Sequence, residues 1–101
     1  MRGSEQGKTR PVLIISRGDV NELLPVVNVL PITSRKAGRR IYPNEALLQG
    51  DRFGLRGESI VLCFQIRTLD KTRLMSEYGL MDDTNVQEEI LEALSFQLSL
   101  I

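Results

Sequence analysis

The sequence predicts a small domain of mainly β structure with a helix at its C-terminal end. Apolar runs rich in branched residues, bounded by turn-forming residues, occur at residues 11–16 and 26–32 and are typical of strands. After residue 82 the apolar residues change to the spacing of an amphipathic helix. We expect residues 1–101 to form one domain, because a chain of this length can bury a core without disulfides.

The two clearest strands are "PVLIIS" at residues 11–16 and "VVNVLPI" at residues 26–32, and residues 17–25 are expected to connect them. Proline lacks a backbone N–H, so Pro31 indicates an edge or a bulge near the end of the second strand. The opening stretch "GSEQGKTRP" has no large apolar side chain, and it is predicted to be a polar loop.

Three further segments complete the expected sheet. Residues 39–48 form a weaker strand, and residues 51–57 form a turn or a single helical turn. Residues 59–69, "SIVLCFQIRTL", predict one long strand buried on both faces, because the run is almost continuously apolar.

The terminal helix is predicted from its capping residues and its apolar stripe. Thr84 and Gln87 have the spacing of a capping box, and Asp82 and Asp83 suit the positive end of a helix. Glu88 and Glu92 share a helical face, and we expect them to be solvated rather than metal ligands. The stripe that should cover the sheet consists of Val86, Ile90, Ala93, Leu94, Gln97, Leu98 and Ile101.

The composition excludes several kinds of chemistry. The chain has no histidine, which removes Ser–His and Cys–His catalysis and His-ligated zinc. Its one cysteine, Cys63, lies in an apolar run and is expected to be a buried, inert thiol of the reducing cytoplasm. No phosphate-binding glycine pattern precedes a helix, so no cofactor is expected. No leader peptide or membrane span is recognised, and we therefore expect a cytoplasmic protein.

The charges are divided along the chain. Residues 1–73 hold all 13 Lys and Arg against seven acids, whereas residues 74–101 hold six acids and no base. The first part could therefore present a positive surface to nucleic acid although the net charge of the chain is zero. Ordinary scatter of charges is the alternative.

Polar residues cluster where the predicted strands meet loops. Arg10 precedes Pro11, which biases Arg10 toward an extended backbone at a strand entrance. A guanidinium offers a planar fork of donors that fits a phosphate or a developing phosphorane. A surface ion pair with Glu5 is the alternative reading of Arg10. The candidates are Glu5, Lys8 and Arg10 in the opening loop, Thr33 and Ser34 after the second strand, and Gln65 and Arg67 in the long strand.

A second cluster is the basic loop, residues 34–40, with the sequence "SRKAGRR". Its cations are Arg35, Lys36, Arg39 and Arg40, which could follow a nucleic-acid backbone with strong salt dependence. Tyr42 beside the loop is the best candidate to stack on a base. A solvated loop is the alternative.

Together, "RGSEQGKTRPVLIIS", "LPITS", "FQIRTLDKTRL" and the closing acidic helix resemble the MazF/PemK (Kid-like) toxins of bacterial type II toxin–antitoxin modules. The resemblance spans essentially the whole chain. It implies a small SH3-like antiparallel β-barrel of the CcdB/MazF/Kid type, with a C-terminal helix, that works as a homodimer. It also implies a sequence-specific, metal-independent endoribonuclease that cuts single-stranded RNA and is blocked when an antitoxin lays an acidic tail along the RNA groove.

The resemblance assigns the family's loop glutamate to Glu5, its arginine before proline to Arg10 and its threonine after the second strand to Thr33. Gln65 and Arg67 match the strand motif near the groove. RNA carries its own nucleophile, the 2′-hydroxyl, so a site without histidine need only orient that group and stabilise charge. Arg10 would stabilise the phosphorane, Thr33 would hydrogen-bond the phosphate or the attacking hydroxyl, and Glu5 would orient Arg10 or accept the proton.

Members of this family usually carry about a dozen residues, including an apolar first strand, before the "GSEQ" motif, and the chain is therefore expected to be N-terminally short. Activity would suffer more than the fold from such a loss, because a sheet edge would be exposed. Two alternatives to a nuclease remain. One is a non-catalytic toxin of this fold that binds a protein such as DNA gyrase, and the other is a truncated toxin or plain barrel that only binds RNA.

Overall fold

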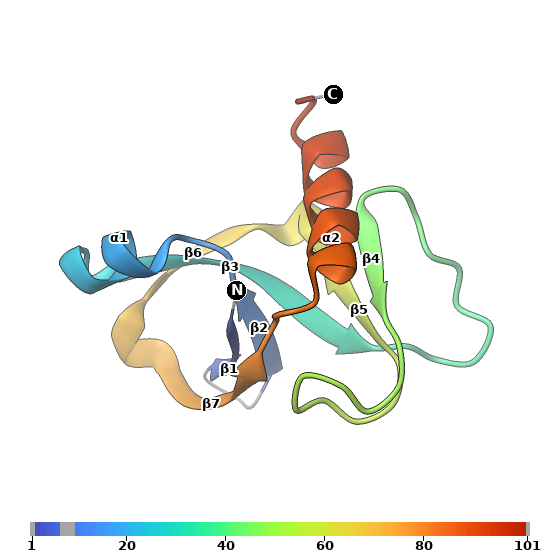
Figure 1. Ribbon diagram of the computed structural model, residues 1–101, viewed down its shortest axis with the longest axis horizontal. Helices are drawn as coiled ribbons and strands as arrows, with labels where there is room; N and C mark the ends of the chain where they lie inside the picture. The colour runs from blue at the N-terminus through green and yellow to red at the C-terminus, as the bar shows by residue number, and fades with distance from the viewer. Residues whose placement is uncertain (1, 7–9, 101) are drawn as a thin grey trace.

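A computed structural model of the chain describes residues 2–6 and 10–100, with side chains from Arg10 to Leu100. The predicted antiparallel β fold with a C-terminal helix is confirmed (Figure 1). Its strands are β1 (Arg2–Gln6), β2 (Arg10–Ile14), β3 (Val26–Ser34), β4 (Glu45–Leu48), β5 (Ser59–Leu62), β6 (Arg67–Asp70) and β7 (Leu74–Leu80). The helices are α1 (Gly18–Leu23), α2 (Thr84–Gln97) and the one-turn 3₁₀ helices η1 (Cys63–Gln65) and η2 (Lys71–Arg73).

Strand β3 organises the sheet because it pairs with three other strands. The strand order is β4-β5-β3-β2-β1-β7, and β6 also pairs with β3. Pro31 lies opposite Val12 of β2, and the next residue, Ile32, pairs with Val61 of β5. Pro31 is therefore the last residue of β3 that pairs with β2, and at this position the lack of a backbone N–H removes little ladder hydrogen bonding.

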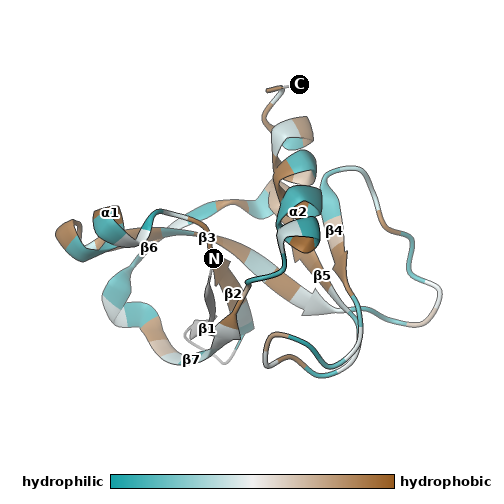
Figure 2. Ribbon diagram, in the orientation of Figure 1, coloured by the Kyte–Doolittle hydropathy of each residue, from teal (hydrophilic) through white to brown (hydrophobic). Residues whose placement is uncertain are grey.

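The core lies on both faces of β2 and β3. On one face, Leu13 and Leu30 pack with Ile90 and Ala93 of α2, so the helix covers this side of the sheet as predicted. On the other face, Val12, Val29 and Leu69 form a second cluster. Figure 2 shows these apolar segments along β2, β3 and β5. Ile101 of the predicted helical stripe lies outside the described residues.

The prediction of one unbroken strand over residues 59–69 is wrong. Ile32 pairs with Val61, whereas Val29 pairs with Arg67, so three steps along β3 correspond to six along its partner. The three residues of η1 take up this excess between β5 and β6. The chain thereby keeps its place beside β3, but Arg67 and Asp70 of β6 are exposed rather than buried.

The structure contains elements that the hydrophobic pattern does not predict. The opening stretch was expected to be a loop, but Arg2–Gln6 is strand β1, which pairs with both β2 and β7. Strand β7 and the short helix α1 were also missed. Of the weak strand predicted over residues 39–48, only Glu45–Leu48 forms.

The capping box predicted for α2 is also wrong. Asp83, not Thr84, caps the helix, and its carboxylate accepts hydrogen bonds from the backbone N–H groups of Asn85 and Val86. Gln87 instead donates its side-chain amide to the carbonyl oxygen of Met81 at 2.6 Å. No helix in the described part of the chain has both the length and the apolar character needed to cross a membrane.

Candidate active site

A groove with a volume of about 730 Å³ lies where the start of β2, the end of β3, η1 and the β4–β5 connection meet. The sequence had pointed to Arg10, Thr33, Ser34, Gln65 and Arg67, and all five line it. The other lining residues are Pro11, Val12, Pro31, Ile32, Gly54, Leu55, Arg56, Ser59, Leu62 and Tyr78.

Strand register explains why Arg10 and Thr33 meet, although they are far apart in sequence. Strands β2 and β3 are antiparallel, with Val12 opposite Pro31. This is the last β2–β3 pair at this end, and Arg10 and Thr33 each lie two residues beyond it, where both line the groove. Both side chains are exposed at this end of the sheet.

The groove is positively charged. Arg10, Arg56 and Arg67 line it, and the guanidinium group of each has no hydrogen bond or ion pair with a described residue. The described lining includes no acidic side chain. Among the residues whose side chains are described, four other arginines are neutralised instead, in the pairs Arg17–Asp19, Arg35–Glu58, Arg39–Glu45 and Arg52–Asp83. Unneutralised guanidinium groups gathered in one concavity form a binding surface for a polyanion.

Two predicted site residues are not fully described. The backbone of Glu5 lies in β1 opposite Pro11, next to Arg10 along β2. The structure describes no side-chain geometry for Glu5, and Lys8 lies outside the described residues. The roles assigned to these two residues stay predictions.

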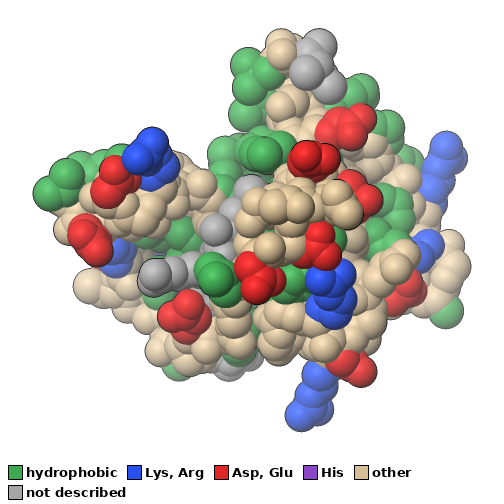
Figure 3. Space-filling model, viewed as in Figure 1, with side chains coloured by type: hydrophobic (Ala, Val, Ile, Leu, Met, Phe, Trp, Pro, Cys, Tyr) green, Lys and Arg blue, Asp and Glu red, His purple; other side chains and the backbone are tan. Residues whose placement is uncertain are grey.

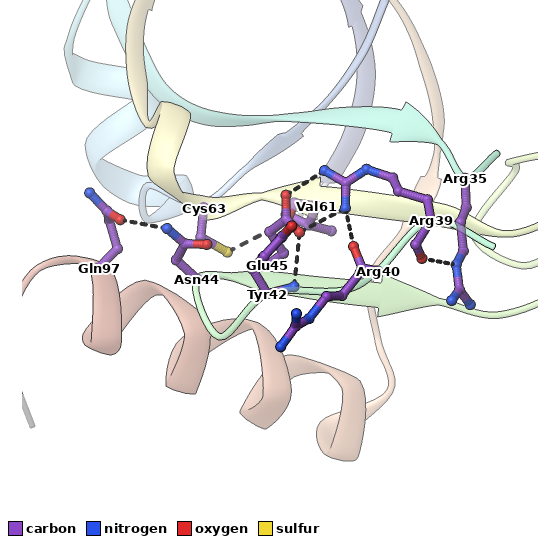
Figure 4. Close-up of polar contacts among 9 residues, drawn as sticks. All are labelled: Arg35, Arg39, Arg40, Tyr42, Asn44, Glu45, Val61, Cys63 and Gln97. Carbon is purple, nitrogen blue, oxygen red and sulfur yellow. Dashed lines mark hydrogen bonds and ion pairs between the residues drawn. The ribbon is translucent and has the colours of Figure 1, made fainter. Parts of the chain in front are cut away.

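The basic loop lies beside the groove but, apart from Ser34, is not part of its described lining. Arg39 donates two hydrogen bonds to the carboxylate of Glu45, at 2.9 and 2.7 Å, and this carboxylate also accepts the backbone N–H of Tyr42 (Figure 4). The Glu45 side chain is 1% exposed, and the hydrogen bonds from Arg39 lower its pKa despite burial. Arg39 therefore has a structural partner, and its predicted contact with RNA would compete with that ion pair.

The remaining loop cations differ in their surroundings. Arg35 is 3.6 Å from the carboxylate of Glu58 and also donates to the carbonyl oxygen of Arg39. Lys36 and Arg40 have no acidic partner among the described residues, although Arg40 lies 5.4 Å from the centre of the Tyr42 ring. Tyr42 lines a separate apolar cavity with Phe64 and Phe96, away from the groove.

Cys63 is buried, as predicted, and burial raises the pKa of its thiol to about 11. A thiol in that state is a poor nucleophile at neutral pH. Among the described residues, no three His, Cys, Asp or Glu side chains are grouped as a metal site. Glu88 and Glu92 are both exposed on α2.

Sequence reasoning missed Arg56 and Tyr78, which also line the groove. Arg56 stands between two glycines in a segment expected to be only a turn, and Tyr78 lies in a strand that the pattern did not predict. A cation in a short segment with glycines at positions 54 and 57, shortly before a buried strand, was the available signal for Arg56.

The chain matches the family of PemK-like, MazF-like toxins of type II toxin–antitoxin systems over residues 1–98. The chain belongs to this family. Endoribonuclease EndoA of Bacillus subtilis is 36% identical over 99 residues, which cover 98% of this chain and 84% of that protein. Endoribonuclease MazF of Staphylococcus saprophyticus is 38% identical over 88 residues, which cover 87% of this chain and 72% of that protein.

Solved structures of this toxin family have the same fold. Toxin MazF-mt6 of Mycobacterium tuberculosis superposes with a TM-score of 0.86 at 26% identity, covering 98% of this chain and 97% of that one. An endoribonuclease from a mycobacterial species, solved in complex with its cognate antitoxin, gives a TM-score of 0.79 at 26% identity, covering 99% and 91%.

Proposed function

We propose that this member of the PemK/MazF toxin family is a sequence-specific, metal-independent endoribonuclease that cuts single-stranded RNA in the groove. The observation that carries the proposal is the meeting of Thr33 with three arginines that have no acidic partner among the described residues. The relatives from Bacillus subtilis and Staphylococcus saprophyticus, both named endoribonucleases, support it.

The proposed reaction uses the nucleophile that RNA itself carries. The 2′-hydroxyl oxygen attacks the adjacent phosphorus, the bond from phosphorus to the 5′-oxygen breaks, and the leaving oxygen takes up a proton. The products are a 2′,3′-cyclic phosphate and a 5′-hydroxyl. Arg10 faces the scissile phosphate and stabilises the negative charge that grows on its oxygens, because a guanidinium stays protonated and binds two oxygens at once.

Thr33 and Glu5 complete the proposed site. Thr33, which lines the groove together with Arg10, hydrogen-bonds the scissile phosphate or the attacking hydroxyl. Glu5 either orients Arg10 or accepts the proton of the 2′-hydroxyl. Ser34, Gln65 and Arg67, together with Lys8, bind the flanking RNA. Among the basic-loop cations, Lys36 and Arg40 are better placed for RNA contact than Arg35 and Arg39, which are held in ion pairs.

We further propose that the toxin acts as a cytoplasmic homodimer and is neutralised by a cognate antitoxin. An acidic, extended antitoxin segment would occupy the same groove, because the groove has a surplus of positive charge and no described acid in its lining. The related mycobacterial endoribonuclease that was solved with its cognate antitoxin supports this partner.

The test is to incubate the purified chain with single-stranded RNA in EDTA and analyse the product ends. Cleavage should occur in EDTA and leave 2′,3′-cyclic phosphate and 5′-hydroxyl ends. Intact RNA, or cleavage only when divalent metal is restored, would contradict it. A parallel gyrase supercoiling assay identifies the protein-poisoning alternative, because inhibition of gyrase without RNA cleavage supports that function instead.

A further inference from the structure

Residues 49–58 connect β4 to β5 and are called the 49–58 loop. They form one wall of the groove. The loop is held at several points. Arg52 donates a 2.7 Å hydrogen bond to the carboxylate of Asp83 at the start of α2, and its guanidinium lies 4.6 Å from the centre of the Phe53 ring. The side chain of Asp51 accepts the backbone N–H of Gly57. These contacts give the loop a defined conformation.

Gly54 lets this loop lie directly against strand β7. A Cβ atom at Gly54 would be 2.3 Å from the carbonyl oxygen of Tyr78, and the residue has a φ of +77°. Both the space and the backbone conformation therefore require glycine. Figure 1 shows the connection from β4 curling back toward the end of β7, and the contact at Gly54 fixes where the loop meets that strand. Leu55 and Arg56 follow at once and line the groove.

Arg56 is exposed and has no hydrogen bond or ion pair with a described residue. It comes from a different element than Arg10 and Thr33, which lie on β2 and β3. An RNA strand has a phosphate at every nucleotide, so a groove that holds the scissile phosphate at Arg10 must also accommodate its neighbours. A guanidinium on another wall, with no described acid in the lining, can neutralise one of them.

We infer that Arg56 binds a phosphate flanking the scissile one and that Gly54 is the positioning residue that holds Arg56 in place. This inference rests on the proposed function, because it names a further substrate contact of the same groove. Arg56 contributes to substrate binding and register, whereas Arg10 and Thr33 act on the reacting atoms. A backbone phosphate contact is independent of base identity.

The binding experiment uses randomised single-stranded 2′-fluoro RNA, which lacks the attacking hydroxyl and stays uncut. Arg56→Gln should weaken binding about tenfold, and the slope of log K against log salt should fall by about 0.7, the contribution of one phosphate of a single strand. The matched control is Arg73→Gln, because Arg73 is an exposed arginine outside the described lining of the groove. Its affinity and slope should equal those of the unchanged chain.

The positioning role of Gly54 is tested against Gly57, which has a φ of +63° but nothing within 4 Å of the place that a Cβ atom would take. Ala at either glycine adds similar backbone strain, but only Gly54→Ala also collides with β7. Gly54→Ala should reproduce the lower salt slope of Arg56→Gln, and Gly57→Ala should keep the original slope. Thermal melting of each variant checks that it is folded.

The outcomes separate this inference from the proposed function. If the unchanged chain does not cut natural RNA but Arg56→Gln still lowers the salt slope, the proposed function fails and the phosphate contact stands. Equal slopes for Arg56→Gln and Arg73→Gln would overturn the inference even if RNA is cut normally. A change in preferred base sequence, with an unaltered salt slope, would also overturn it, because Arg56 would then read a base edge.

Discussion

Arg10 and Arg39 illustrate how the partner of an arginine decides what its guanidinium can do. Arg39 is bound to the buried carboxylate of Glu45 and stabilises the fold around residues 35–45. Arg10 lines the groove with no described acidic partner, so its full charge is available to a bound anion. The proposed catalytic role therefore belongs to Arg10.

Replacement of Arg10 should separate catalysis from folding. Arg10→Ala should abolish RNA cleavage, and Arg10→Lys should lower kcat by about a hundredfold or more, because an ammonium cannot present the two-pronged donor that stabilises the phosphorane. Single-turnover cleavage measures the loss, and circular dichroism checks the fold. Arg73→Lys, outside the described lining, is the control and should keep full activity. Undiminished cleavage by Arg10→Ala would show that Arg10 is a surface arginine with no catalytic role.

The Glu45–Arg39 pair should make stability depend on pH. The hydrogen bonds from Arg39 lower the pKa of Glu45 in the folded state, so their contribution is present above its ordinary value of 4.5 and is lost as the pH falls through the lowered value. Glu45→Gln should reduce the free energy of unfolding by about 2 kcal/mol at pH 7, and this difference should shrink below pH ~4.

Urea denaturation at the two pH values measures the effect of Glu45→Gln. Glu58→Gln is the control, because the Glu58 carboxylate is 48% exposed and 3.6 Å from Arg35, where an ion pair contributes little. If Glu45→Gln lowers the free energy of unfolding by the same amount at both pH values, the ion pair with Arg39 is not the cause of the loss.

Among the secondary-structure elements, helix α2 is capped by Asp83, a residue that also binds the 49–58 loop of the groove wall. The Asp83 carboxylate accepts backbone N–H groups of Asn85 and Val86 and also pairs with Arg52 of the 49–58 loop. One side chain therefore links the start of the helix to the loop that carries Arg56.

Substitutions at Asp83 should distinguish the two contacts. Asp83→Ala removes both and should lower the melting temperature by about 5 °C, whereas Asp83→Asn keeps a capping oxygen and should lower it less. Calorimetry measures both variants. Thr84 follows the capping residue and makes no capping hydrogen bond in the structure, so Thr84→Ala should change the melting temperature little. A larger effect at Thr84 than at Asp83 would support the capping box instead.

The sequence predicts elements whose own side chains decide their structure. Strands β2 and β3 and helix α2 have strong apolar patterns, and their existence is confirmed. Strand β1 has a polar sequence and forms because β2 and β7 supply backbone partners on both sides, which no local pattern records. The interruption at Cys63–Gln65 arises from the register in which β5 and β6 pair with β3. The apolar sequence of residues 59–69 gives no sign of this interruption.

The groove also combines residues that local sequence reveals with residues that only tertiary contacts bring there. Arg10 and Thr33 could be proposed from the sequence because each stands where a predicted strand meets a loop, and in the structure both line the groove. Arg56 reaches the groove through the contact between Gly54 and the backbone of Tyr78, which depends on tertiary structure. The positions of Arg10 and Thr33 in the groove can be predicted from the sequence, whereas the position of Arg56 depends on the tertiary fold.

At the scale of the whole molecule, the division of charge along the sequence is also a division in space. The last part of the chain contains no base, and Glu88, Glu89 and Glu92 are exposed on α2. Figure 3 shows acidic side chains gathered over the region of this helix. The groove is lined by arginines from the first part of the chain. A polyanion should therefore be drawn to the groove and kept from the outer face of α2, and its binding should weaken with salt.

Attack by the 2′-hydroxyl of the RNA is tested with an RNA that this chain cuts, carrying a single 2′-deoxy residue on the 5′ side of the cut. The deoxy RNA should bind with nearly unchanged affinity and stay intact at that position, because the attacking hydroxyl is gone. A deoxy residue one nucleotide further along should leave cleavage unchanged. Efficient cleavage at the deoxy position would show that the 2′-hydroxyl is not the nucleophile, because another group would then have to attack the phosphate.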